Sequence, residues 1–246
     1  MAGFLGRRPV DSAIETLVFE AGGRSRPLIV KRMAQARRMR LSVDPRDGGV
    51  RLVMPLGGSI RAALKWVEGH RAWIEQALAA LPDARPIGAG TVIEVDGKAL
   101  TIEIGDGGRG VKRIGNRLIV APPGELLSGR IVRWLKKLAL EKLDTETRRF
   151  GALAGVTIGT VAIGDPRARW GSCSSNGDIR YSWRLILAPP SVLEATVAHE
   201  VAHRLHMDHS AEFHAAQRRL LGRDPKVERA WLRSHGRELY WLGREP

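Results

Sequence analysis

The sequence predicts an α+β fold, and two observations support this prediction. Three strand-like runs begin with Arg-Leu and end at proline. Each run is followed by a segment with helical periodicity. The runs are 51–55, 117–122 and 184–189, and the helical segments are 59–81, 126–150 and 191–206. Hairpin-like segments before the first two helices make the front of the chain rich in β-structure. The repeated pattern fits an internal duplication and, equally well, the common strand-proline-helix connection.

The hairpin-like segments are 14–31 with 37–53, and 91–104 with 111–120. Two tight turns are predicted in the second group, at Asp96-Gly97 and Gly115-Asn116, because these residues enter the left-handed region at low cost.

A proline- and glycine-rich stretch at 81–90 is the predicted linker between two portions of the chain. We expect a β-rich, basic N-terminal portion with a closing helix at 1–85. A second domain is expected at 86–246, with its core from about residue 126. A softer boundary falls at 121–129.

The pentad His199-Glu-Val-Ala-His203 lies in an apolar stretch with helical patterning. Residues four apart on a helix share one face, so the two histidines can bind one metal ion, with Glu200 beside it. This arrangement is typical of a zinc site that activates water for hydrolysis, with the carboxylate as proton acceptor. Ser191 and Glu194 form a predicted capping box that begins the helix. The alternative is a buried helix with hydrogen-bonded histidines.

A catalytic zinc needs a third protein ligand, and three downstream histidines are candidates. His206 lies too far along the same helix. His209 is favoured, because the chain can leave the helix at His206 or Asp208, in the left-handed region, and fold back. Ser210 would then be the N-cap of a new helix running to about residue 221. His214, on that helix, is the fallback ligand.

The segment before the metal helix is predicted to form a wide hairpin in an antiparallel sheet. Its strands are expected at 156–163 and 179–187, joined by a loop at 165–178 that could form the wall of a cleft. A last helix is expected at 224–242.

Three segments give the chain a resemblance to the YgjP-like family of zinc metallohydrolases, relatives of the WLM and SprT-like proteases. They are Arg169-Trp-Gly-Ser-Cys-Ser174, Tyr181-Ser-Trp-Arg-Leu-Ile-Leu-Ala-Pro-Pro190 and the stretch from His199 to Ser210. The resemblance covers at least residues 37–240. It implies a zincin-like core of the gluzincin type, zinc at His199, His203 and His209, and Glu200 as general base. The WLM and SprT-like relatives act on proteins attached to DNA.

A metallopeptidase is therefore the favoured function. The developing oxyanion needs a donor, for which Arg169 is the first choice; the others are Tyr181, Tyr240 and His235. A salt bridge is the alternative role for Arg169, and Trp170 and Trp183 are expected to be packing residues. Two other function classes remain open. One is a nucleotide phosphohydrolase with phosphates held by Arg167, Arg169 and Arg184, and the other is a non-catalytic nucleic-acid-binding protein with structural zinc.

The composition is strongly basic, with 40 Lys and Arg against 26 Asp and Glu, a net charge of +14 and a pI near 11.0. Such a charge favours an anionic partner, and non-specific nucleic acid is one candidate. Basic residues cluster at 31–40 and again at 130–142, although either cluster could simply be a solvated face. The single cysteine, Cys173, excludes an internal disulfide, and charges interrupt every apolar stretch. We expect a cytoplasmic protein that is not bound to a membrane, with a polypeptide or nucleotide substrate.

Overall fold

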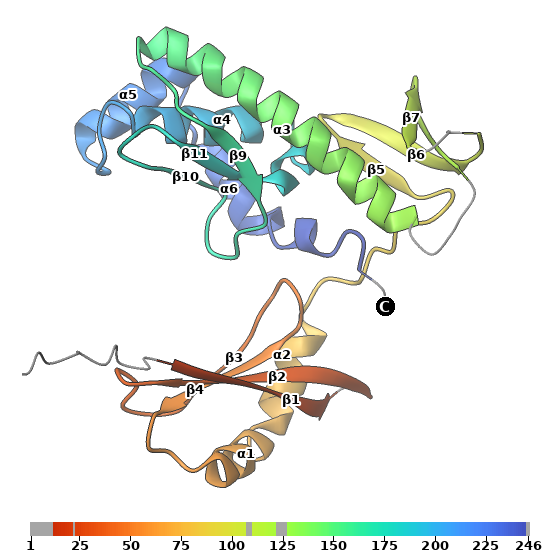
Figure 1. Ribbon diagram of the computed structural model, residues 1–246, viewed down its shortest axis with the longest axis vertical. Coiled ribbons are helices and arrows are strands. Elements are labelled where there is room, and N and C mark those ends of the chain that lie inside the picture. Colours follow the sequence, from red (N-terminus) through yellow and green to blue (C-terminus); the bar gives the residue numbers. More distant parts are fainter. Residues whose placement is uncertain (1–11, 22, 107–109, 122–126, 245–246) are drawn as a thin grey trace, which may run out of the picture. The chain divides into compact units, whose positions relative to one another are not determined.

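The computed structural model describes residues 12–21, 23–106, 110–121 and 127–244. These residues form three small sheets and six α-helices, which confirms the α+β fold (Figure 1). The chain divides into two compact units, Met1–Pro82 and Asp83–Pro246. In the described ranges, no helix is long and apolar enough to cross a membrane.

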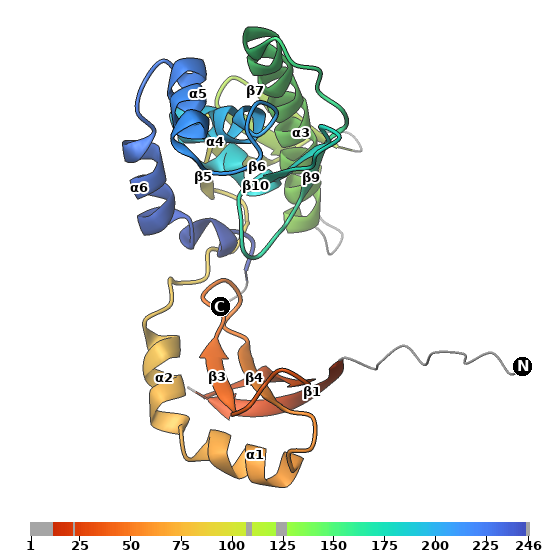
Figure 2. The same cartoon turned by 90° about the vertical axis from the view of Figure 1, so that its left-hand side faces the viewer.

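The first unit is one four-stranded sheet with two helices on one of its faces (Figure 2). The sheet order is β1-β2-β4-β3, in which β2 and β4 are parallel and the other pairs antiparallel. The elements are β1 Ser12–Ala21, β2 Arg24–Met33, β3 Arg40–Val43, β4 Val50–Pro55, α1 Ile60–Glu68 and α2 Arg71–Ala79. Alternate residues of β4 are buried in the core with Leu28, Val30 and Ile74.

The single helix predicted at 59–81 is wrong, because the chain forms two helices that break at Gly69 and His70. Glycine is, after proline, the residue least favourable to a helix. The Gly69 N–H bonds back to the Lys65 carbonyl, and the His70 N–H bonds back to the Val67 carbonyl. The side chain of Ser59 caps α1 by accepting from the Ala62 N–H.

The second unit begins with a sheet of the same design. Its order is β5-β6-β8-β7, again with a parallel central pair flanked by antiparallel neighbours. The strands are β5 Val92–Val95, β6 Lys98–Ile104, β7 Val111–Ile114 and β8 Arg117–Val120. Both predicted turns are confirmed, with positive φ at Asp96 (49°), Gly97 (72°) and Gly115 (57°).

The third sheet contradicts the predicted hairpin. Its strands, β9 Val161–Gly164, β10 Gly171–Cys173 and β11 Ile179–Ser182, lie in the order β10-β11-β9. β9 and β11 are parallel, because the chain between them crosses to the far side of β11 and adds β10 there as its antiparallel partner. The strand predicted at 179–187 ends at Ser182, whose side chain caps a 3-10 helix, Trp183–Leu187.

All three sheets share one connectivity. Each sheet contains three strands that are consecutive in the sequence. The first and third of these strands are parallel neighbours, and the second pairs with the other side of the third. The trios are β2-β4-β3, β6-β8-β7 and β9-β11-β10. Each trio precedes one of the three helical segments of the sequence repeat. This shared topology favours duplication over a mere strand-proline-helix connection.

Four helices complete the second unit: α3 Leu127–Ala154, α4 Pro190–Ala202, α5 Ala211–Leu221 and α6 Lys226–His235. The long α3 lies beside α4 and reaches toward the sheet of β5 to β8, and its buried face joins one core with α4 (Figure 1).

The predicted capping box is wrong: α4 begins at Pro190 without a side-chain cap, and Glu194 instead pairs with Arg223. The last predicted helix is also too long, because α6 ends at His235 and a 3-10 helix, Glu238–Tyr240, follows.

Candidate metal centre

Three histidines converge at the C-terminal end of α4. His199 lies on α4, His203 caps its end with helical dihedral angles, and His209 lies in the loop before α5. One ring nitrogen from each lies within 4.8 Å of the others, and the Nε2 atoms of His199 and His209 are 3.3 Å apart. His214 is not part of this group, since its ring centroid is 6.4 Å from that of His209.

The loop that carries His209 turns back without strained backbone. The prediction of a left-handed His206 or Asp208 is wrong, because Asp96 is the sole non-glycine residue with positive φ in the described parts of the chain. The turn is instead held by side chains. Asp208 accepts from the Ser210 N–H, and Ser210 caps α5 by accepting from the Phe213 N–H, as predicted for this serine.

The ring of Phe213 supports all three imidazoles. It is fully buried, and its centroid lies 4.9 Å from His199, 4.5 Å from His203 and 4.8 Å from His209. An apolar ring beneath the cluster restricts the rotation of the ligand side chains and keeps water from that side.

A hydrogen bond at the second ring nitrogen selects the ligand form of His203, and His199 also has a hydrogen-bond partner. His203 Nδ1 lies 3.2 Å from the carbonyl oxygen of His206, and His199 hydrogen-bonds the side chain of buried Gln217 on α5. When a ring donates through one nitrogen, the other keeps its lone pair for a metal.

Burial also keeps these rings neutral. Together with the neighbouring His203 and His209, it lowers the pKa of His199 to about 4, and it lowers the pKa of His203 as well. A neutral imidazole is the form that binds a metal ion. Three convergent nitrogen donors, two of them oriented by hydrogen bonds, therefore fit a divalent metal.

Glu200 lies on α4 directly beside β10. Its side chain is 5% exposed, and a Cβ on Gly171 would stand 2.6 Å from its Cγ and 2.7 Å from its Cδ. Only glycine at this position leaves room for the carboxylate. Burial raises the pKa of Glu200 to about 7, while the positive charge of Arg169 acts in the opposite direction.

A cavity of about 230 Å³ opens next to this carboxylate. His199 and Glu200 line it, and Trp170, Val192 and Leu232 add apolar surface to its lining. Arg169 also lines the cavity; it is exposed and pairs with no acidic side chain among the described residues, so the alternative salt bridge is absent.

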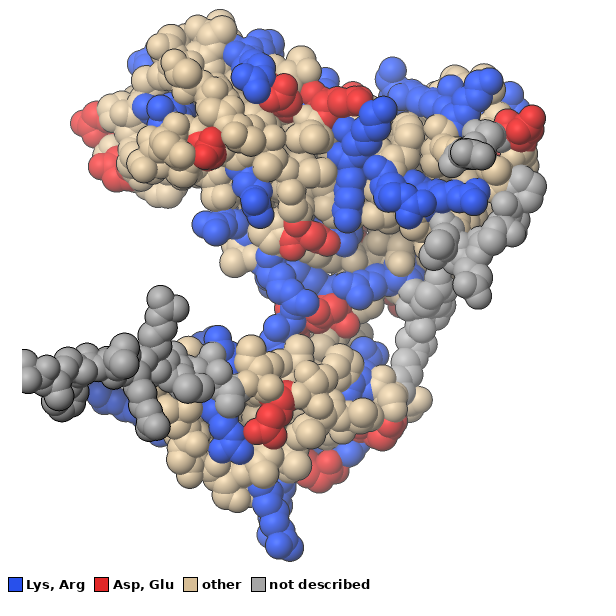
Figure 3. Space-filling model, in the orientation of Figure 1, with Lys and Arg blue, Asp and Glu red and all other residues tan. Residues whose placement is uncertain are grey.

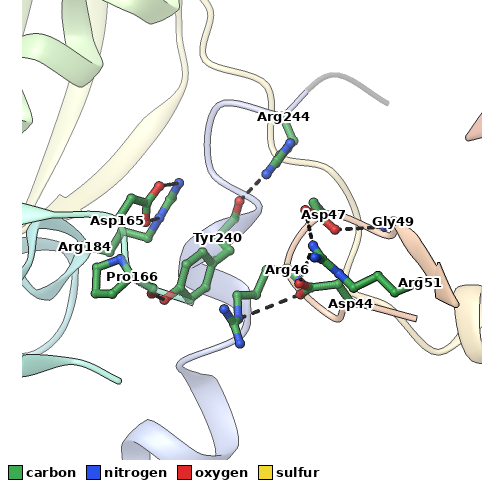
Figure 4. Close-up of polar contacts among 10 residues, drawn as sticks. All are labelled: Asp44, Arg46, Asp47, Gly49, Arg51, Asp165, Pro166, Arg184, Tyr240 and Arg244. Carbon is green, nitrogen blue, oxygen red and sulfur yellow. Dashed lines mark hydrogen bonds and ion pairs between the residues drawn. The ribbon is translucent and has the colours of Figure 1, made fainter. Parts of the chain in front are cut away.

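The other candidate donors are engaged elsewhere. The Tyr181 hydroxyl, whose pKa burial raises, lies 3.0 Å from the Thr147 hydroxyl, and the Tyr240 hydroxyl donates to the Pro166 carbonyl (Figure 4). His235 hydrogen-bonds its neighbour Ser234.

Arg184, an expected phosphate ligand in the phosphohydrolase interpretation, is buried. It donates to Asp165 at 2.8 Å and to the Leu239 carbonyl at 2.6 Å (Figure 4). That part of the phosphohydrolase prediction is wrong.

Sequence reasoning named the three histidines, Glu200 and Arg169. The structure brings the three histidines together, and His199, Glu200 and Arg169 line one cavity. Sequence reasoning assigned no role at this site to Gly171, Phe213 or Gln217. The small residue between Trp170 and Ser172 was the available indication of a close approach to another element. Phe213 and Gln217 reach the histidines only because of how α5 packs, and the spacing of residues in the sequence does not define that packing.

Comparison with known sequences agrees with this geometry. Neither the curated proteins nor the solved structures contain a significant match to the chain. A protein-family model described as YgjP-like, metallopeptidase domain, matches residues 37–235, which include the histidine cluster, Glu200 and Arg169. The chain therefore belongs to the YgjP-like family of metallopeptidase domains.

Proposed function

We propose that this protein is a zinc-dependent peptidase with a zincin-like core. His199, His203 and His209 would hold the ion, because three nitrogen donors with one open position are the usual ligand set of catalytic zinc. Bound zinc would supply Lewis-acid activation of water and polarisation of the scissile carbonyl.

Glu200 is the proposed general base. Its carboxylate accepts a proton from the attacking water and then donates it to the leaving amine. A pKa of about 7 in the protein without metal suits a group that both accepts and returns a proton near neutrality, and a nearby cation would lower it. Arg169, which lines the same cavity and has no ion pair with a described residue, is the proposed donor to the developing oxyanion.

The outer edge of β10, with which no other described strand pairs, is the observation that favours a peptide as substrate. β10 is an outer strand of its sheet and passes directly beside Glu200. On either side of β10, the Trp170 carbonyl accepts from the Ser182 N–H of β11, and the Ser174 N–H donates to the carbonyl of Asp178, just before β11. Because bonding alternates along an antiparallel strand, the backbone groups of Gly171 and Cys173 face away from β11. An extended peptide could pair with them and bring its scissile bond to Glu200.

A hydrolysis screen tests this proposal. Zinc-loaded protein is incubated with a mixed peptide library, an unfolded protein and nucleoside triphosphates, and products are identified by mass spectrometry. We expect cleaved peptides and intact nucleotides. Release of phosphate or pyrophosphate without peptide cleavage would instead assign the site to a phosphohydrolase.

Gly171→Ala tests the contact between β10 and the general base. The added methyl group must displace the Glu200 carboxylate, so we expect kcat/KM for peptides to fall by roughly 10- to 100-fold. Gly88→Ala is the matched control, because its Cβ would meet only the Thr91 hydroxyl at 3.9 Å. Thermal melting checks the fold of both variants, and unchanged kcat/KM in a folded Gly171→Ala protein would contradict the assigned geometry.

A further inference from the structure

The two basic clusters of the sequence differ in the structure. In the α3 cluster, Lys137 pairs with Glu141 at 3.8 Å, and Lys142 lies 3.6 Å from Glu146. Arg130 donates to the Ala121 carbonyl. Most basic side chains of α3 are therefore already engaged by groups of this protein.

The other cluster, at 31–40, lies at the end of β2 and the start of β3. Arg32 pairs there with Glu15 at 3.3 Å, but the three arginines at 37–40 face solvent. Arg37, Arg38 and Arg40 are exposed, and none has an ion pair or hydrogen bond with any residue that the structure describes. Figure 3 shows basic side chains on the visible face of both units.

Neighbouring arginines of the same unit are neutralised. Arg46 and Arg51 both face Asp44, at 3.9 Å and 2.9 Å, and Arg51 also contacts Asp47 (Figure 4). Nearby carboxylates thus pair with these two arginines and leave the three at the β2–β3 connection exposed.

The three exposed arginines line a groove of about 550 Å³. Met33, Met39 and Val53 contribute apolar surface, and no acidic residue lines the groove. Val53 is opposite Arg40 in the sheet and alternates with buried Leu52 and Met54, so the groove lies on the face of the sheet that α1 and α2 leave open.

We propose that this groove, defined by Arg37, Arg38, Arg40, Met33, Met39 and Val53, binds the phosphodiester backbone of single-stranded nucleic acid. Guanidinium groups stay charged at any physiological pH and form paired hydrogen bonds with phosphate oxygens. The apolar floor suits sugars and base edges, and a concave surface admits a strand but not a flat bilayer. No aromatic residue lines the groove to stack on bases, so the affinity comes from phosphate contacts, which do not distinguish one base from another.

Fluorescence anisotropy of the full chain with labelled oligothymidine and oligouridine, from 50 to 200 mM salt, tests the proposal. Removing three phosphate contacts should lower the slope of log K against log salt by about 2, and the affinity near 0.1 M salt by about 10- to 100-fold. We expect these changes in the groove variant Arg37→Gln/Arg38→Gln/Arg40→Gln.

The matched control is Arg61→Gln/Lys65→Gln/Arg133→Gln. It removes the same charge from exposed positions outside the groove that have no ion pair among described residues. Its affinity should fall much less. The variant Arg37→Lys/Arg38→Lys/Arg40→Lys keeps the charge and should keep the salt slope, whether or not the glutamine variant folds.

Three outcomes would overturn the proposal. The first is no binding at 50 mM salt, and the second is an equal loss in the groove and control variants, which would reflect net charge alone. The third is competition by poly-glutamate or anionic vesicles as effective as that by unlabelled oligonucleotide. Glu200→Gln should not change the binding, so failure here is separate from failure of the proposed peptidase activity.

Discussion

Glu200→Gln is expected to lower kcat for peptide hydrolysis by ~10²-fold or more, while the protein keeps its fold and its zinc. The amide has nearly the shape of the carboxylate, so it can remain in the space beside Gly171, but it cannot accept a proton. Because this side chain is buried against Gly171, a base from solvent cannot easily take its place.

The measurement is a pair of assays on the same preparation. Turnover is followed on a peptide identified in the hydrolysis screen, and zinc content is determined by elemental mass spectrometry. If Glu200→Gln loses its zinc, the carboxylate is a metal ligand and the assignment as general base is wrong.

His209→Ala is expected to weaken zinc binding more than any change outside the three histidines. The substitution removes one of three converging nitrogens. Zinc affinity should therefore fall by more than the roughly 10- to 100-fold that is typical when a residue that only orients a metal ligand is replaced. Competition with a chromogenic chelator measures the affinity without reference to activity.

His206→Ala is the control for this experiment. Its contact with the cluster is the backbone carbonyl that faces His203 Nδ1, and that carbonyl remains in the alanine variant. A large loss of zinc affinity in His206→Ala, with little change in His209→Ala, would move the third ligand to His206.

Features that depend on residues close in sequence could be predicted. The four-residue spacing of His199 and His203 places both on one side of α4, whatever the rest of the chain does. Ser210 caps the helix that follows it, and Asp96-Gly97 forms the tight turn expected of it. In each case the deciding contacts span only a few residues, so the local sequence contains the relevant energetics.

Features that depend on distant partners were decided by the tertiary structure alone. Strand periodicity is the same in parallel and antiparallel pairs, so the sequence could not show that β9 and β11 are parallel. Nor could it show that Asp165 binds Arg184, that Gly171 meets Glu200, or which of the clustered basic residues have carboxylate partners. These contacts join groups that packing brings together across the chain, and their free energy depends on burial and geometry that exist only once the sheets and helices have assembled.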